Sequence, residues 1–263
     1  MFLEKEDVTI YYEVRGEGEP LVMVHGAAMD ADWYKGAASI LSCYYQVITY
    51  DRRGSSRSKA SKEAAFDLDT QVGDLKDLLD ALHLENVTIV GASAGAIASH
   101  RFMTLYPERV KKAILYEPAV VTLLEGTEYS KREWVDKMED LIARKKINSA
   151  MFEFVQSIGV LDSRAPEKDP EANMREMNNL YHFLPNEYET FVEYRPDPEK
   201  SRELADKTIV AVGDSSGDST YATAAKYLAQ MIGKEVLYYP GLHNAPYDLP
   251  KEFAICVLGT LML

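Results

Sequence analysis

The sequence contains only two cysteines among 263 residues, Cys43 and Cys256. A disulfide framework is therefore excluded, although a single bridge between the two thiols stays open. Both cysteines lie in apolar stretches, so we expect buried free thiols in a reducing compartment. The chain also has no His-Glu-x-x-His motif, no cysteine pair at metal-ligand spacing and no phosphate-binding glycine loop. These absences argue against metal and nucleotide chemistry, and we expect no cofactor.

Long apolar runs and excess positive charge are missing as well. No run is long enough to cross a bilayer, and no basic-then-apolar signal segment opens the sequence, so we expect a cytoplasmic protein without a membrane partner. With 29 Lys and Arg against 42 Asp and Glu, the formal net charge is −13. That balance argues against nucleic-acid binding and mildly disfavours anionic substrates, although a local pocket could override the repulsion. A small-molecule substrate remains as the expected partner, and a homodimer stays open.

Strand and helix patterns alternate in the first half of the chain and again near its end. Short, fully apolar strands alternating with helices predict an α/β fold with a mostly parallel sheet covered on both faces. Residues 120–205 instead carry charged amphipathic patterns, so we expect a helical cap there, inserted into a core of residues 1–119 and 206–263. Strands are predicted over 8–14, 21–24, 45–50, 87–90, 112–116, 208–212 and 236–239, and helices over 68–82, 94–106, 221–232 and from 251 onward.

The most informative stretch is Val-Thr-Ile-Val-Gly-Ala-Ser-Ala-Gly-Ala at residues 87–96. A β-branched strand leads directly into Gly-x-Ser-x-Gly, and small residues then start a helix. A serine at such a tight turn adopts a strained backbone, and its neighbours two residues away must be almost bare because strand and helix pass close together. Gly91 and Gly95 meet that need. The pattern predicts that Ser93 is a nucleophile; a chance glycine–serine loop is the alternative.

A serine nucleophile needs a base, and the chain offers five histidines. His243 follows the last predicted strand and lies downstream of Ser93, where the order Ser…acid…His puts the base. His25 follows the strand at 21–24 and is expected to brace its loop. We therefore predict His243 as the base. The remaining histidines fall on helices or in the insertion: His83, His100 and His182.

The developing oxyanion needs hydrogen-bond donors. One should be the backbone N–H of Ala94, directly after the nucleophile. The second should come from the loop after the strand at 21–24, with Ala27 as the expected donor because Gly26 lets the backbone approach closely. An ordinary glycine turn is the alternative interpretation of this loop.

The acid that orients the base has three candidates. Asp214 ends the strand after the insertion, which is the usual place, and it is the first choice. Glu117 ends the strand before the insertion, from which a carboxylate can reach the same histidine. Asp218 lies further along the loop of Asp214. Each could equally be a turn or cap residue, a role that suits Asp before Ser-Ser-Gly.

Together these motifs resemble the α/β-hydrolase superfamily over nearly the whole chain. The resemblance implies an eight-stranded, mostly parallel sheet with helices on both faces, a cap after the sixth strand and a Ser-acid-His triad. It is nearest to the capped esterase-like branch that includes cofactor-free haloperoxidases and C–C bond hydrolases. The motifs that carry it are Gly91-Ala92-Ser93-Ala94-Gly95, His25-Gly26, Tyr50-Asp51-Arg52-Arg53-Gly54 and Pro240-Gly241-Leu242-His243.

Two loops depart from that branch. Ser55-Ser56 follows Gly54, where Ser or His and then Gly are usual. This departure affects only the conformation of the loop. The loop after Val212 is short and lacks the frequent Gly-x-x-Asp spacing, and this departure is why the choice of acid stays open.

The predicted function is a carboxylesterase-like serine hydrolase that acts on a small, largely apolar ester, thioester or lactone through an acyl-enzyme. Alternatives are a C–C bond hydrolase, a lyase or a peptidase on the same fold, or a non-catalytic ligand-binding receptor. Aromatic residues of the insertion could line the acyl pocket or pack between cap and sheet: Trp134, Phe152, Phe154, Tyr181 and Phe183.

Overall fold

A central sheet organises the computed structural model, which describes residues 1–61, 63–157 and 170–262. Eight strands follow the order β1-β2-β4-β3-β6-β7-β8-β9, and a ninth short strand, β5, pairs with β2. Pairing is antiparallel around β2 and parallel from β4 to β9, which confirms the mixed, mostly parallel sheet. The strands are β1 (Phe2–Glu4), β2 (Val8–Arg15), β3 (Pro20–Val24), β4 (Gln46–Tyr50), β5 (Lys59–Ala60), β6 (Val87–Ala92), β7 (Val110–Tyr116), β8 (Thr208–Gly213) and β9 (Leu237–Tyr239).

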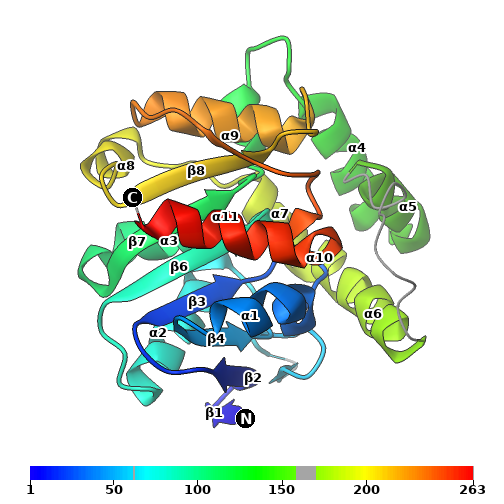
Figure 1. Ribbon diagram of the computed structural model, residues 1–263. Coiled ribbons are helices and arrows are strands. Elements are labelled where there is room, and N and C mark those ends of the chain that lie inside the picture. The colour runs from blue at the N-terminus through cyan, green and yellow to red at the C-terminus, as the bar shows by residue number, and fades with distance from the viewer. Residues whose placement is uncertain (62, 158–169, 263) are drawn as a thin grey trace.

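Helices cover both faces of the sheet (Figure 1). Those of the core are α1 (Lys35–Leu41), α2 (Leu68–Ala81), α3 (Ala94–Leu105), α9 (Thr220–Met231), α10 (Ala245–Asp248) and α11 (Pro250–Met262). Those between β7 and β8 are α4 (Arg132–Ala143), α5 (Ile147–Ser157), α6 (Pro170–Asn186), α7 (Tyr188–Val192) and α8 (Pro198–Glu203). Short 3₁₀ helices span Ala31–Tyr34, Pro107–Arg109 and Val121–Leu124.

Successive residues of the central strands point to opposite faces, and both faces are apolar. On β3, Val22 and Val24 pack into the layer formed with α2, α3 and α9, whereas Leu21 and Met23 pack into the layer formed with α1 and α11. All four side chains are at most 1% exposed. A strand buried on both sides must be apolar at every position, which is why the strands read as continuous hydrophobic runs.

The helices α4–α8 form the segment between β7 and β8, where the sequence predicts a cap. In Figure 1, α4, α5 and α6 lie together at one side of the sheet. Their apolar faces join the same hydrophobic core as α2, α3 and α9, through residues such as Met138, Phe154 and Phe183. The cap segment is thus continuous with one core layer of the protein.

Buried charges fix the loop after β4 to its surroundings. Asp51 accepts hydrogen bonds from the backbone N–H of Ala31 at 2.8 Å and from Arg57 Nε at 2.7 Å. Arg53, only 1% exposed, donates through Nε and Nη2 to the two carboxylate oxygens of Asp74 at 2.6 and 2.8 Å. Buried charges are tolerated only when paired in this way.

The neighbouring guanidinium, Arg52, binds this loop to the cap segment. Its Nη1 donates to Glu187 Oε2 at 2.6 Å, and both side chains are 1% exposed. Burial works to raise the pKa of Glu187, but the charge of the Arg52 guanidinium holds that pKa below its usual range. The same loop therefore contacts β3, α2 and the junction of α6 and α7.

Several local predictions needed correction. Cys43 is exposed and Cys256 only half-buried, so the expected burial of both thiols was wrong, although both are free. The edge strands β1 and β5 and the helix α1 were not predicted. Elements this short contain too few apolar positions to give a clear periodic signal. Within the described residues, no helix is long and apolar enough to cross a membrane.

We expect Gly95→Ala to destabilise the fold, because an added Cβ would lie 2.0 Å from the backbone oxygen of Val24. The loss should be at least about 1–3 kcal/mol in the free energy of unfolding, measured by urea titration. Gly73→Ala on α2 is the matched control, since nothing lies within 4 Å of its added Cβ. That variant should gain about 0.5–1 kcal/mol. Equal effects of the two substitutions would contradict the close approach at Gly95.

Candidate active site

The turn between β6 and α3 holds Ser93 in a backbone conformation that L-residues rarely adopt. Its φ is +56° and its ψ −126°. The Ser93 carbonyl accepts from the N–H groups of Ala96 at 3.0 Å and Ile97 at 3.2 Å, which starts α3 immediately. A Cβ added at Gly91 would lie 2.3 Å from Ser99 Oγ and 2.5 Å from the backbone oxygen of Gly95. The strained serine and the bare neighbours form a tight strand–turn–helix elbow, the geometry that a nucleophilic serine requires.

The loop after β3 lies directly against this turn. A Cβ added at Gly26 would be 3.2 Å from the Cβ of Ser93 and 3.8 Å from its Oγ. Ala27 and Ala94, the expected oxyanion donors, line the same cavity as Ser93. The glycine is what allows the loop to come so near the serine side chain.

His25 braces that loop, as the sequence indicated. Its fully buried ring donates from Nδ1 to the Gly26 carbonyl at 2.8 Å, and Nε2 accepts from the backbone N–H of Arg52 at 2.9 Å. Burial, reinforced by the Arg52 charge, lowers the pKa of His25 to about 3. The imidazole is therefore neutral at pH 7 and joins two loops of the core.

A buried carboxylate–imidazole pair lies beside the serine. Glu117 Oε2 and His243 Nδ1 are 2.6 Å apart, with side-chain exposures of 0% and 6%. The second oxygen, Oε1, accepts from the backbone N–H of Gly213 at 2.8 Å. With Nδ1 bonded to the carboxylate, Nε2 is the ring nitrogen left for proton transfer.

The expectation that Asp214 orients His243 was wrong. Asp214 Oδ1 accepts from the backbone N–H of Gly241 at 2.9 Å and from Ser215 Oγ at 2.9 Å, so its carboxylate closes the turns after β8 and β9. Asp218 is 80% exposed and lies 3.5 Å from Lys226 Nζ. The longer Glu117 side chain, extending from the neighbouring strand end, contacts the histidine instead.

Two further features of the pair were missed in the sequence. Glu117 has φ +44°, an uncommon value for a non-glycine residue, which follows from its tight turn after β7. The Tyr221 ring stacks on His243 with centroids 3.8 Å apart and an interplanar angle of 25°. The Glu-Pro dipeptide directly after an apolar strand was the available signal for Glu117; nothing local marked Tyr221.

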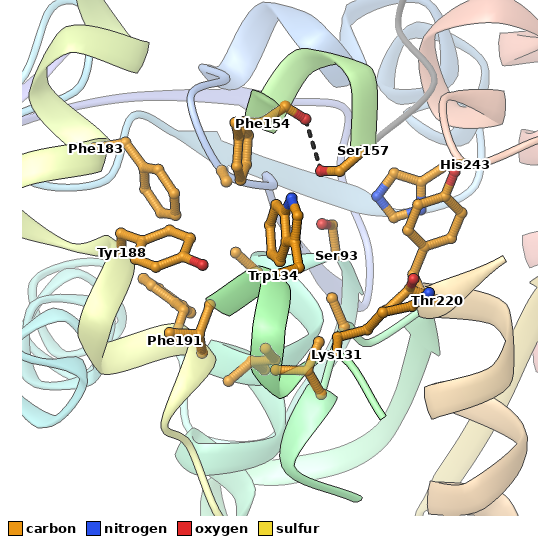
Figure 2. Close-up of a pocket in the computed structure, with 17 residues that line it drawn as sticks. Ser93, Lys131, Trp134, Phe154, Ser157, Phe183, Tyr188, Phe191, Thr220 and His243 are labelled. Atoms are coloured by element: carbon orange, nitrogen blue, oxygen red, sulfur yellow. Dashed lines mark hydrogen bonds between the residues drawn. The ribbon is translucent and has the colours of Figure 1, made fainter. Parts of the chain in front are cut away.

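Ser93 and His243 face one cavity of about 330 Å³ (Figure 2). Its walls are predominantly apolar and come from the core and from α4–α7. For the aromatic residues of the insertion, the sequence left open whether they line the pocket or pack between cap and sheet. Trp134, Phe154 and Phe183 line the cavity, whereas Phe152 and Tyr181 are 61% and 44% exposed and point elsewhere. The other lining residues are Ala27, Ala94, Ile97, Ala119, Val121, Lys131, Ser157, Tyr188, Phe191, Val192, Thr220 and Tyr221.

Metal ligation has no support within residues 1–61, 63–157 and 170–262, where no group of three or more His, Cys, Asp or Glu could hold an ion. The chemistry that the described site offers is that of its own side chains: a hydroxyl, an imidazole and a carboxylate.

Comparison with known proteins gives the family. A family model described as the alpha/beta hydrolase fold matches residues 19–158. The chain belongs to the α/β-hydrolase fold family. An uncharacterised hydrolase of Bacillus subtilis strain 168, YraK, is 30% identical over 257 residues, which cover 96% of this chain and 92% of that protein.

Solved structures agree with the family at the level of the fold. A bromoperoxidase from Bacillus anthracis is 22% identical, with a TM-score of 0.78 over 97% of this α/β-hydrolase and 96% of that chain. A thermophilic esterase from Thermogutta terrifontis is 19% identical, with a TM-score of 0.71 over 97% and 93% of the two chains.

The neutral, buried His25 predicts how the stability of this α/β-hydrolase depends on pH. Its pKa is about 3 in the folded protein and near 6.5 when unfolded, so the unfolded chain binds the additional proton between these values. The free energy of unfolding should therefore fall as pH decreases from about 6.5, by up to about 1.4 kcal/mol per pH unit from this residue.

Urea titrations between pH 7 and 5 measure that slope, and His25→Gln should make it shallower while lowering stability at pH 7. An unchanged slope in His25→Gln would show that His25 is not held neutral in the folded state.

Proposed function

We propose that this α/β-hydrolase is a serine hydrolase that cleaves small, largely apolar esters, thioesters or lactones through an acyl-enzyme. Ser93 is the nucleophile, His243 the general base and acid, and Glu117 the carboxylate that orients the imidazole. The single observation that carries the proposal is the buried Glu117–His243 contact of 2.6 Å on the cavity that also contains the strained Ser93.

The first half of the mechanism forms the acyl-enzyme. His243 Nε2 takes the Ser93 proton while Oγ attacks the substrate carbonyl, and the imidazolium is stabilised by Glu117. The backbone N–H groups of Ala27 and Ala94 bind the oxyanion. His243 then protonates the leaving alkoxide or thiolate, and the ester bond breaks.

The second half returns the enzyme to its resting state. His243 removes a proton from water, the resulting hydroxide attacks the acyl-enzyme carbonyl, and the same N–H groups stabilise the second tetrahedral intermediate. Ser93 leaves with the proton held by His243, and the carboxylic acid is released. No oxidation or reduction occurs in either half.

The apolar cavity supports the choice of substrate class. Aromatic side chains of α4–α7 stand around the serine: Trp134, Phe154, Phe183, Tyr188 and Phe191 (Figure 2). Such walls bind an alkyl or aryl acyl group through burial of apolar area, worth about 25 cal/mol per Å². The esterase named among the structural relatives is in keeping with this class.

Ser93→Ala should lower kcat/KM for short p-nitrophenyl esters by at least about 10³-fold, since the nucleophile itself is removed. A fluorophosphonate should add to wild-type Ser93 and leave the variant unlabelled, as followed by intact mass. Ser149→Ala, at an exposed position on α5, is the matched control and should behave as wild type. Retained turnover in Ser93→Ala, or a wild type that neither turns over esters nor reacts with the probe, would favour a non-catalytic binding protein instead.

Glu117→Gln should lower kcat by about 10³- to 10⁴-fold, because an amide N–H facing Nδ1 imposes the wrong imidazole tautomer. Asp214→Asn retains the Oδ1 that accepts from Gly241 and should change kcat by no more than roughly two-fold. Steady-state kinetics on one activated ester distinguish the two carboxylates. If Asp214→Asn were the more damaging substitution, Glu117 would not be the orienting acid.

A further inference from the structure

The cavity contains a buried hydroxyl that has no hydrogen-bond partner. Tyr188, at the start of α7, is 1% exposed, and its Oη has no partner in the described part of the chain. In Figure 2 its hydroxyl points from the aromatic wall toward the middle of the cavity. Burial raises the pKa of Tyr188, so the group remains a protonated donor at neutral pH. A buried donor of this kind is normally satisfied, and here an acceptor oxygen of a bound molecule could satisfy it.

The cavity also contains an unpaired cation. Lys131 lines it from the N-cap position of α4, and its side chain makes no cap hydrogen bond. Its ammonium forms no ion pair or hydrogen bond with residues 1–61, 63–157 or 170–262. No aspartate or glutamate lies among the lining residues. Within the described part of the chain, no carboxylate neutralises Lys131 inside this cavity.

Its place in the cavity distinguishes Lys131, which is the one lysine or arginine among the described lining residues. The chain is strongly acidic, and several other lysines and arginines pair with carboxylates: Lys5 with Asp74, Lys76 with Asp80, Arg101 with Asp69 and Arg195 with Glu125. Lys131 is half-buried. An ammonium beside apolar walls attracts an anion more strongly than one in bulk water does, and this local attraction can override the repulsion from the distant acidic surface. The positive end of the α4 helix dipole acts in the same direction.

Resting on the proposed function, we propose that the substrate is an ester or lactone that carries a carboxylate, which Lys131 binds, while Tyr188 donates to an acceptor oxygen of the same molecule. Lys131 and Tyr188 are thus specificity-determining residues. The Lys131 ammonium offers only donors, and the buried Tyr188 hydroxyl, which can donate or accept, has no partner in the described part of the chain. A purely hydrocarbon acyl group would leave both groups unsatisfied, so they discriminate against it.

The test compares esters that differ only in one charge. The first pair is the mono-p-nitrophenyl ester of suberic acid and its ω-methyl ester, which place a carboxylate or a neutral group on the acyl side. The second pair is the hexanoate ester of 4-hydroxybenzoic acid and that of its methyl ester, which place the carboxylate on the leaving-group side. We expect wild-type kcat/KM to favour the charged member of one pair by about ten-fold.

Lys131→Met should abolish that preference by raising KM for the charged ester, with little change for its neutral partner. Lys146→Met is the matched control: it removes the same charge from an exposed position of the cap segment and should keep the preference. The wild-type preference should also weaken between low and high salt. Tyr188→Phe retains the ring and should lower kcat/KM for the preferred substrate several-fold.

The outcomes separate this inference from the proposed function. If wild type prefers the neutral member of both pairs, or if Lys131→Met affects charged and neutral esters equally, carboxylate recognition is wrong, and the serine hydrolase proposal stands on the turnover of the neutral esters. If no ester of either kind is hydrolysed and Ser93 resists the fluorophosphonate, the proposed function itself is wrong.

Discussion

The close approach of three backbone segments at Ser93 is the constraint on which the site depends. Strand β6, helix α3 and the loop after β3 meet with so little space that a methyl group at Gly95 would overlap the Val24 carbonyl. Such contact is possible only where side chains are missing, and it holds Ser93 at a positive φ that would otherwise relax. The packing around the turn therefore maintains the strained backbone conformation of Ser93.

The parallel sheet brings the acidic candidates and the histidine to the same edge. Glu117 follows β7, Asp214 follows β8 and His243 follows β9, so the three side chains start from adjacent strand ends on one edge of the sheet. Which of the two carboxylates contacts His243 then depends on side-chain length and on the other hydrogen bonds that each carboxylate makes. Asp214 is occupied by the Gly241 amide, whereas Glu117 is held by Gly213 on one oxygen and contacts His243 with the other. One carboxylate stabilises the loop and the other supports the imidazole.

The cap segment contributes the walls of the cavity and is tied to the core by polar contacts. The Arg52–Glu187 ion pair is fully buried, Asn179 Oδ1 accepts from the backbone N–H of Ser56 at 2.7 Å, and Arg175 lies 3.0 Å from Asp30. These contacts fix α6 and its junction with α7, and thereby hold Tyr188 on the wall of the cavity. Residues far from Ser93 therefore hold the walls of the cavity in place.

The sequence by itself determined the fold class, the elbow at Ser93 and the position of His243 in the chain, because apolar periodicity and bare glycines are local signals. Val87 to Gly95 encodes a strand, a sharp turn and a helix without help from distant residues. Only the tertiary structure decided between Glu117 and Asp214, showed that Phe152 and Tyr181 point away from the cavity, and brought Lys131 and Tyr188 onto its walls. Those outcomes depend on the length of each side chain and on which side of each cap helix faces the cavity. The spacing of residues along the chain specifies neither.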